Sequence, residues 1–304
     1  MSAAKAPVSS IIELILLGAL WGGSFLLMRI AVPEFGAFAL AEARVAIAAL
    51  FLLIFVFWRK QHKLLWQHRR PLGFVGLFNS AIPFCLICWA TLSISAGLAS
   101  IINATAPLFT AVIAVLVYRQ RFTPIQLIGL VAGFAGVAVL MAEKASVQAE
   151  QFLPAIGAGL LAALCYGIAV NYSKHQQPEM PAMVAATGSQ VSAAIALMPL
   201  AVIYWPDAIP SFDAWLAAAL LGIFCTSIAY ILYFRLIAQV GPQFAISVTY
   251  LVPLFGVGWG WMILGETLTL ISLIAGAIIV ASTMLVNARK KARMPVSESG
   301  SQRG

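Results

Sequence analysis

Charge is the property that this sequence has least of. Asp, Glu, Lys and Arg make up only 9% of its 304 residues, whereas they supply about a quarter of a soluble domain. Hydrophobic residues make up 62%, and the mean hydropathy is +0.98. They occur in blocks of about twenty, the length that crosses a bilayer. The composition therefore argues against a large soluble helical protein and indicates that lipid surrounds most of the chain.

Residues that usually carry chemistry are also scarce. The three histidines, His62, His68 and His175, lie beside Lys or Arg in polar connections and form no cluster with carboxylates. This pattern disfavours a membrane-embedded enzyme that modifies lipid, although that class stays as an alternative. No Gly-Lys-Ser/Thr phosphate-binding motif occurs, which excludes an ATP-driven pump. A repeated filter loop or charged ring, which a channel would need, is absent too.

Cysteine offers no metal site. Cys85 and Cys88 have the spacing of a metal or redox pair, but they lie within an apolar block without a second pair or a nearby histidine. Cys165 and Cys225 are equally enclosed by apolar residues. All four are interpreted as small buried hydrophobes, and no metal or cofactor is expected.

Ten apolar blocks divide the chain, and each can cross a hydrocarbon core of roughly 30 Å at 1.5 Å per residue. The first block follows ten residues with no small-residue cleavage site, so we expect a retained helix and not a signal peptide. The expected class is an all-α polytopic membrane protein with ten transmembrane helices, at about 11–31, 36–57, 71–93, 97–118, 124–142, 152–172, 181–204, 212–236, 242–264 and 268–287.

Positive charges gather on one side of the predicted membrane. With the N-terminus in the cytoplasm, fifteen of the eighteen Lys and Arg residues fall on the cytoplasmic side. Arg29 and Lys144 fall on the other side, and Arg44 lies within the second span. This bias predicts that both termini are cytoplasmic and that the protein lies in the cell inner (plasma) membrane. The net charge of +8 then belongs to topology, and no nucleic-acid partner is expected.

Two stretches repeat one another at about half the chain length. Residues 103–109 (Asn-Ala-Thr-Ala-Pro-Leu-Phe) correspond to 249–255 (Thr-Tyr-Leu-Val-Pro-Leu-Phe), so Pro107 and Pro253 lie 146 positions apart. Because five spans per copy is an odd number, the copies cross the membrane in opposite directions, with a site between them. The predicted organisation is a cytoplasmic N-terminus 1–10, a first five-helix repeat 11–142, an extracytoplasmic connector 143–151, a second inverted five-helix repeat 152–287 and a cytoplasmic basic tail 288–304.

These features resemble a known family. Residues 17–25 (Leu-Gly-Ala-Leu-Trp-Gly-Gly-Ser-Phe), Arg44 in the second span, the Pro-Leu-Phe helices and the Gly265-Glu266 turn are similar to the drug/metabolite transporter superfamily, in its ten-helix EamA-type exporter branch. The resemblance implies export of small metabolites, with amino acids, aromatic ones included, as the nearest substrates in character. One departure is Gln120, which stands where the first repeat usually carries a turn glutamate.

Candidate substrate-binding residues are polar or aromatic side chains within the apolar blocks. Amide and hydroxyl groups beside aromatic rings suit a neutral or zwitterionic solute. An interfacial belt of Trp and Tyr is the alternative interpretation of the aromatic residues. The candidates are Trp21, Ser24, Asn79, Trp89, Asn103, Tyr166, Asn171, Thr226, Tyr230 and Thr249.

Prolines and buried charges form a second group of candidates. Pro107 and Pro253 are expected to bend their helices and act as hinges, since each removes a backbone donor. Glu42, Arg44 and Glu266 are charges at membrane depth, which calls for a partner or a function such as ion coupling. A glycine stripe at 129, 133 and 136 either scaffolds each half or supports a dimer. Monomer and homodimer both stay open.

The favoured interpretation is a secondary transporter that exports small neutral or zwitterionic metabolites by alternating access. Its partners would be the small-molecule substrate and the lipid bilayer. The scarcity of buried Lys and Arg disfavours strongly anionic substrates such as phosphates. Drugs, quaternary ammonium compounds and nucleosides are alternative substrates. Proton coupling and facilitated diffusion are both compatible with the sequence.

Overall fold

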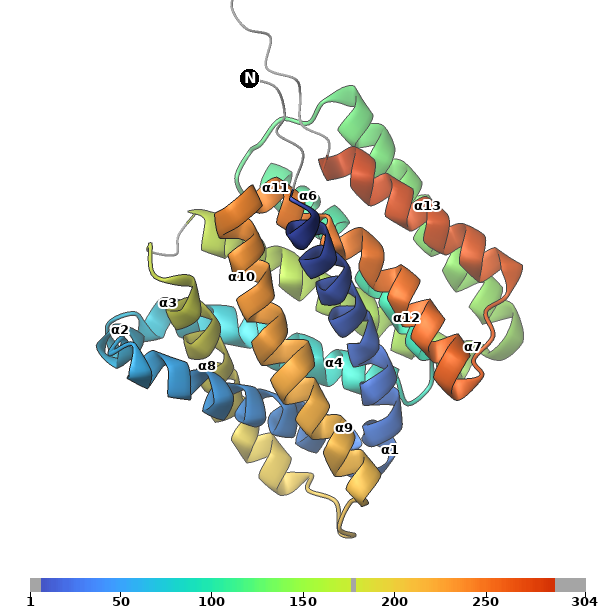
Figure 1. Ribbon diagram of the computed structural model, residues 1–304. Helices are drawn as coiled ribbons and strands as arrows, with labels where there is room; N and C mark the ends of the chain where they lie inside the picture. Colours follow the sequence, from blue (N-terminus) through green and yellow to red (C-terminus); the bar gives the residue numbers. More distant parts are fainter. Residues whose placement is uncertain (1–6, 176–178, 288–304) are drawn as a thin grey trace, which may run out of the picture.

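The computed structural model describes residues 7–175 and 179–287, and every regular element in these ranges is a helix (Figure 1). Two of them are short π-helices, labelled η. The elements are α1 Val8–Trp58, α2 His62–Gln67, α3 Arg69–Gly76, η1 Leu77–Ala81, α4 Ile82–Ala90, α5 Ala96–Asn103, α6 Ala106–Leu116, α7 Pro124–His175, α8 Ala182–Ile203, α9 Phe212–Gly222, η2 Ile223–Ile228, α10 Ala229–Val240, α11 Pro242–Ile246, α12 Val248–Leu264 and α13 Leu270–Asn287.

Nine segments within the described ranges are long and apolar enough to cross a membrane, which confirms the expected class of all-helical polytopic protein. Ten apolar blocks are expected. The number of segments is one lower because α1 contains two of the blocks, 11–31 and 36–57. Its 51 residues would measure about 77 Å, over twice the thickness of a hydrocarbon core. Gly36, with φ 73° and ψ 168°, interrupts the helix without a loop. The two parts of α1 run in different directions in Figure 1.

The boundary between the repeats is helical as well. Helix α7 continues through residues 143–151, the expected connector, and joins the candidate spans Pro124–Glu143 and Phe152–His175. The predicted terminal segments fall mostly outside the described residues, which exclude 1–6 and 288–304; residues 8–10 already belong to α1.

The third apolar segment of each repeat contains a π-helix at the same place. Leu77 begins η1 and Ile223 begins η2, and these residues lie 146 positions apart, like the prolines. A glycine precedes each one. A Cβ on Gly76 would lie 2.5 Å from the Ser189 carbonyl oxygen, and one on Gly222 would lie 2.6 Å from Ile47. The two glycines therefore allow α3 to touch α8 and α9 to touch α1 at corresponding points.

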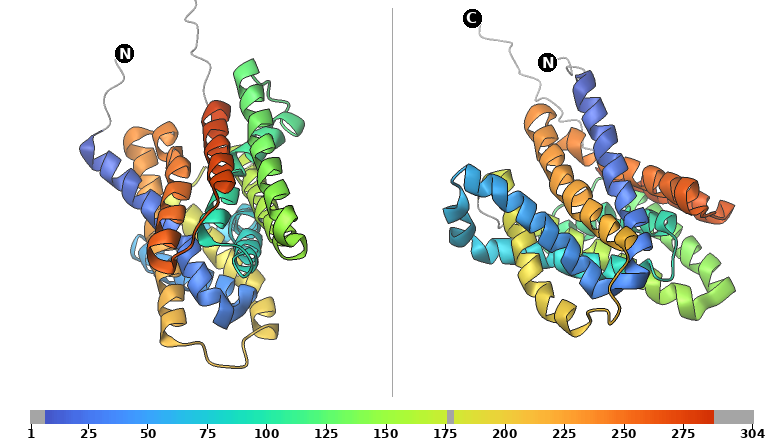
Figure 2. Two further views of the ribbon diagram at one scale, coloured as in Figure 1. Left: turned by 90° about the vertical axis from the view of Figure 1, so that its right-hand side faces the viewer. Right: turned by 60° about the horizontal axis from the view of Figure 1, so that its bottom comes forward.

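The repeats are interleaved in space. Helix α1 packs against α8, α9 and α12 of the second repeat, and α13 packs along the first part of α7 (Figures 1 and 2). The glycine stripe of α7 faces α13, where Gly129 meets Leu285 and Gly136 meets Ile279. The stripe therefore connects the first repeat to the second, whereas the expected scaffold lay within each half. Its use in a dimer stays a prediction.

The proline helices differ between the repeats. In the first repeat the helix breaks between α5 and α6, and Pro107 sits at the start of α6, where a missing backbone donor costs nothing. In the second repeat the break falls at Ser247, and Pro253 lies inside the continuous helix α12. A helix break therefore accompanies each proline, but only the break in the first repeat is adjacent to it.

Candidate functional site

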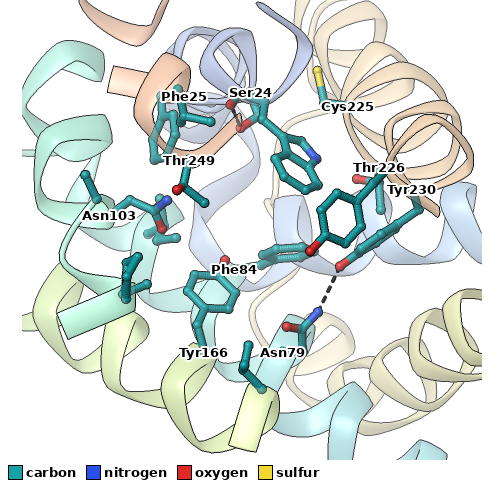
Figure 3. Close-up of a pocket in the computed structure, with 18 of the residues that line it drawn as sticks. Ser24, Phe25, Asn79, Phe84, Asn103, Tyr166, Cys225, Thr226, Tyr230 and Thr249 are labelled. Carbon is teal, nitrogen blue, oxygen red and sulfur yellow. Dashed lines mark hydrogen bonds between the residues drawn. The ribbon is translucent and has the colours of Figure 1, made fainter. Parts of the chain in front are cut away.

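A cavity of about 300 Å³ lies between the repeats, at the lower end of the volumes found for ligand pockets. Both repeats supply its wall, through α1, η1, α4, α5, α6, α7, η2, α10, α11, α12 and α13. Figure 3 shows labelled side chains from many of these elements surrounding an open centre. A space of this size enclosed by both halves can hold a small metabolite.

Aromatic rings form much of this wall. The Trp21 ring lies 5.4 Å from Tyr233 and 6.5 Å from Tyr230, the latter edge to face. Phe84 and Tyr166 add two further rings. Phe84 and Tyr230 occupy corresponding positions of the repeats, 146 apart, so the repeat offset would have pointed to Phe84, which reasoning on polar residues missed. The rings provide apolar surface for a hydrophobic side chain.

The polar groups of the cavity differ in how many partners they have. Asn79 Nδ2 donates to the Tyr230 hydroxyl at 2.8 Å, which fixes both groups. Thr249 Oγ1 donates to its own helix, to the Ile246 carbonyl at 2.9 Å. By contrast, the side chains of Asn103 and Tyr166 make no hydrogen bond to the described residues, and both are drawn facing the centre in Figure 3. These two groups have capacity for a ligand.

Arg44 is the charged residue of the wall, which contains no Asp or Glu among the described residues. Only 5% of it is exposed. Its Nε donates to Thr226 Oγ1 at 2.9 Å, its Nη1 contacts Met28 Sδ at 3.7 Å, and its guanidinium carbon lies 3.7 Å from the centre of the Phe84 ring. The cavity therefore has a positive wall.

Gln190 is the counterpart of Arg44, 146 positions later. Its Nε2 donates to Ser80 Oγ at 3.0 Å, and Ser80 in η1 corresponds to Thr226 in η2. Each repeat therefore reaches with one polar side chain to the π-helix of the other repeat. Sequence reasoning missed Gln190, although the offset of 146 applied to Arg44 would have found it.

Eight of the ten expected substrate-binding residues line the cavity, and two lie elsewhere. Trp89 is 45% exposed on the outside of the bundle. Asn171 is buried, and its Nδ2 donates to the carbonyls of Thr110 and Gly167, both at 2.9 Å, so it ties α7 to α6. Pro107 lines the cavity and Pro253 does not. Glu42 also lies off the lining, with a buried Oε2 that has no partner among the described residues.

Glu266 holds the end of the bundle farther from the N-terminus. Its carboxylate accepts from the backbone N–H groups of Ala96 at 3.0 Å and Gly97 at 3.4 Å, at the start of α5, and lies 3.9 Å from Arg29 Nε. A carboxylate is favourable at a helix N-terminus because the free N–H groups and the helix dipole are positive. We call Glu266 together with Arg29, Ala96 and Gly97 the Glu266 latch.

The corresponding positions in the other repeat form a weaker contact. Gln120 and His175 lie 146 positions from Glu266 and Arg29, and their Nε2 atoms lie 3.4 Å apart. Tyr118 stacks on the His175 ring at 3.9 Å. On this side Ile246 and Asn287, at the ends of α11 and α13, extend the lining of the cavity. The cavity thus reaches toward the end where the described chain starts and finishes.

The fold and the cavity define an all-helical membrane protein built from two related halves with a ligand-sized space between them. The pattern of the EamA-like transporter family matches residues 8–142 and again 153–288. The chain therefore belongs to the EamA-like transporter family, which confirms the family and the transport class expected from the sequence.

Named relatives agree with this assignment. The chain is 28% identical over 278 residues to the "Uncharacterized inner membrane transporter YedA" of Escherichia coli, covering 89% of this chain and 88% of the relative. It is 22% identical over 275 residues to a "Probable terminal-alkyne amino-acid exporter" of Streptantibioticus cattleyicolor, covering 90% and 91%. A crystal structure, 19% identical, superposes with a TM-score of 0.62 over 92% of this chain and 96% of the other, which shows the same fold.

Proposed function

We propose that the protein is a secondary transporter that exports small neutral or zwitterionic metabolites, amino acids with apolar or aromatic side chains among them, by alternating access. The observation that carries the proposal is the cavity between the repeats, with aromatic walls and free polar groups at Asn103 and Tyr166. Several rings with a few polar groups suit a solute that has one apolar and one polar end. The relative named as a probable terminal-alkyne amino-acid exporter supports the same substrate class.

The proposed membrane arrangement has ten spans in two inverted repeats, in the cell inner membrane with both termini in the cytoplasm. Helix α1 would supply two spans that meet at Gly36, since its length exceeds one crossing. In this arrangement the Glu266 latch closes the outer end, and the cavity is reached from the cytoplasm. Rearrangement of the π-helices and of the breaks beside Pro107 and at Ser247 would open the outer end and close the cytoplasmic one.

Counterflow into proteoliposomes tests the proposal. Vesicles containing purified protein are loaded with unlabelled phenylalanine, tryptophan or leucine, and uptake of the labelled compound is followed. We expect transient accumulation, reduced at least tenfold in Asn103→Ala because the ligand loses a hydrogen-bond partner. Trp89→Phe, outside the cavity, is the matched control and should exchange normally. Exchange of none of the neutral or zwitterionic compounds would refute the substrate class.

Glu42 is the proposed group for proton coupling. Its side chain is half-buried, and the buried Oε2 lacks a hydrogen bond among the described residues. Glu42→Gln should abolish flux driven by an imposed pH gradient while counterflow at equal pH continues. Unchanged gradient-driven flux in this variant would remove Glu42 from the coupling mechanism.

A further inference from the structure

Arg44 carries a positive charge that its structural role does not require. Bringing a charge to membrane depth costs about 2.5–3.5 kcal/mol on insertion scales, so a counter-charge is expected. Within residues 7–175 and 179–287, no carboxylate lies within ion-pair distance of this guanidinium. The Glu42 side chain, two positions away, lies outside the cavity lining. The positive charge therefore faces a space that contains no acidic group.

Gln190 shows that the tie between the repeats needs no charge. It occupies the corresponding position, is fully buried and makes the corresponding hydrogen bond to Ser80. A neutral amide thus joins one repeat to the π-helix of the other, as the Arg44 Nε does for Thr226. The remaining donors of Arg44 must serve another purpose.

The free donors of Arg44 are arranged to receive an anion. A guanidinium has five N–H donors; one is used on Thr226 and another meets only the weak acceptor sulfur of Met28. The Phe84 ring covers one face of the guanidinium, so a ligand cannot stack on that face, and the N–H donors point outward along the edge. Edge-on approach is the geometry in which a planar guanidinium binds a carboxylate through two parallel hydrogen bonds.

We propose that Arg44 binds the carboxylate of the transported compound. This inference rests on the proposed function and specifies its substrate class: monocarboxylates with an apolar or aromatic body, for which Trp21, Tyr166 and Tyr230 form the wall. Because the described part of the wall contains no acidic residue, the ammonium group of an amino acid meets only neutral acceptors and aromatic faces. The carboxylate is required, the ammonium is dispensable, and cationic compounds are excluded.

Four related ligands, the variant Arg44→Gln and two control variants test the proposal. Thermal unfolding of the purified protein is measured with phenylalanine, 3-phenylpropionate, phenylalaninamide and phenethylamine. We expect stabilisation by the two carboxylates and none by the amide or the amine. In Arg44→Gln the apparent affinity for both carboxylates should fall at least tenfold, because two charge-assisted hydrogen bonds are lost.

The variant is chosen to preserve the fold, since Gln190 already makes the equivalent contact in the other repeat. Its melting temperature without ligand reports on folding, Arg44→Lys should recover part of the affinity, and Trp89→Phe should bind as the original protein does. Equal stabilisation by the amide and the acid, or an unchanged affinity in Arg44→Gln, would overturn the carboxylate site. Arg44-dependent binding without counterflow would leave the site standing and refute transport. Counterflow that is independent of Arg44 would support transport and refute the carboxylate site.

Discussion

Arg44 in the first repeat and Gln190 in the second occupy corresponding positions, and each reaches to the π-helix of the other repeat. The backbone plan is therefore shared, while the charge is present in one copy only. Ser80 and Thr226 accept in the two places, so a hydroxyl is enough to complete either tie. The comparison separates what the fold needs, a buried hydrogen bond, from what the cavity uses, a positive charge on one side.

The two ends of the bundle differ in the same way. One is held by the charged groups Arg29 and Glu266 and by backbone N–H groups of α5. The other has the uncharged amide of Gln120 beside the His175 ring. Charge-assisted hydrogen bonds are roughly twice as strong as neutral ones. The cavity extends toward the end with the weaker contact.

The largest effect, a loss of stability, should come from substituting the glycines that precede the π-helices. At these two positions the repeats are alike. Gly76→Ala and Gly222→Ala each place a Cβ within 2.6 Å of the neighbouring helix, which should cost about 3 kcal/mol by overpacking. Thermal unfolding in detergent measures the loss. Gly157→Ala, with no atom within 4 Å of the added Cβ, is the control. A large loss in only one of the two variants would contradict the equivalence of the π-helices.

Removing the charge from the latch should have the next largest effect. Glu266→Gln weakens the contacts to α5 and Arg29 by about 2 kcal/mol, which favours the state open at that end. With Cys85, Cys88 and Cys165 replaced, Cys225 in the cavity wall reports opening through its reaction with an impermeant maleimide added outside. Labelling should rise at least tenfold, and in the control Glu150→Gln, an exposed glutamate of α7, it should not. Unchanged labelling in Glu266→Gln would show that the latch does not close this end.

Substituting Gly36 should have a smaller effect on stability. It tests whether this residue causes the change of direction within α1. Its φ of 73° with ψ of 168° lies in a region open almost only to glycine, and a Cβ there would meet no atom within 4 Å. Gly36→Ala should therefore cost about 1–2 kcal/mol through backbone strain alone, seen in thermal unfolding. Gly73→Ala, also without a neighbour but inside helix α3, should be neutral or slightly stabilising. Equal stability of the two variants would contradict the break.

The sequence was sufficient for the class of fold because bilayer thickness limits what an apolar block can be. It also predicted two repeats from Pro107 and Pro253, and most of the cavity residues from polarity at membrane depth. It could not show that the blocks 11–31 and 36–57 form one broken helix. Glycine is also frequent inside unbroken transmembrane helices, so Gly36 alone does not indicate a break.

The contacts across the repeats were beyond sequence reasoning for a different reason. Asn171 was expected in the cavity, since it is polar and lies within an apolar block. Its amide instead satisfies the carbonyls of Thr110 and Gly167, and only the packing of α7 on α6 decides between these roles. Gln190 was overlooked because a single amide has no periodic signal. Its meaning comes from Arg44, which occupies the same position in the other copy.

The smallest effect should come from making the first repeat resemble the second. Gln120→Glu places a carboxylate beside His175 in an exposed position, where an ion pair with the protonated ring contributes about 0.5 kcal/mol and is screened by salt. We expect counterflow to slow by about twofold at low ionic strength, because closure at the Gln120 end is favoured, and to recover at 0.5 M salt. Gln120→Asn adds no charge and should show no salt-dependent change. Faster counterflow in Gln120→Glu, or slowing that persists in high salt, would contradict a latch at this end. The two turns would then differ in more than charge, and the correspondence of Gln120 with Glu266 would be one of sequence position alone.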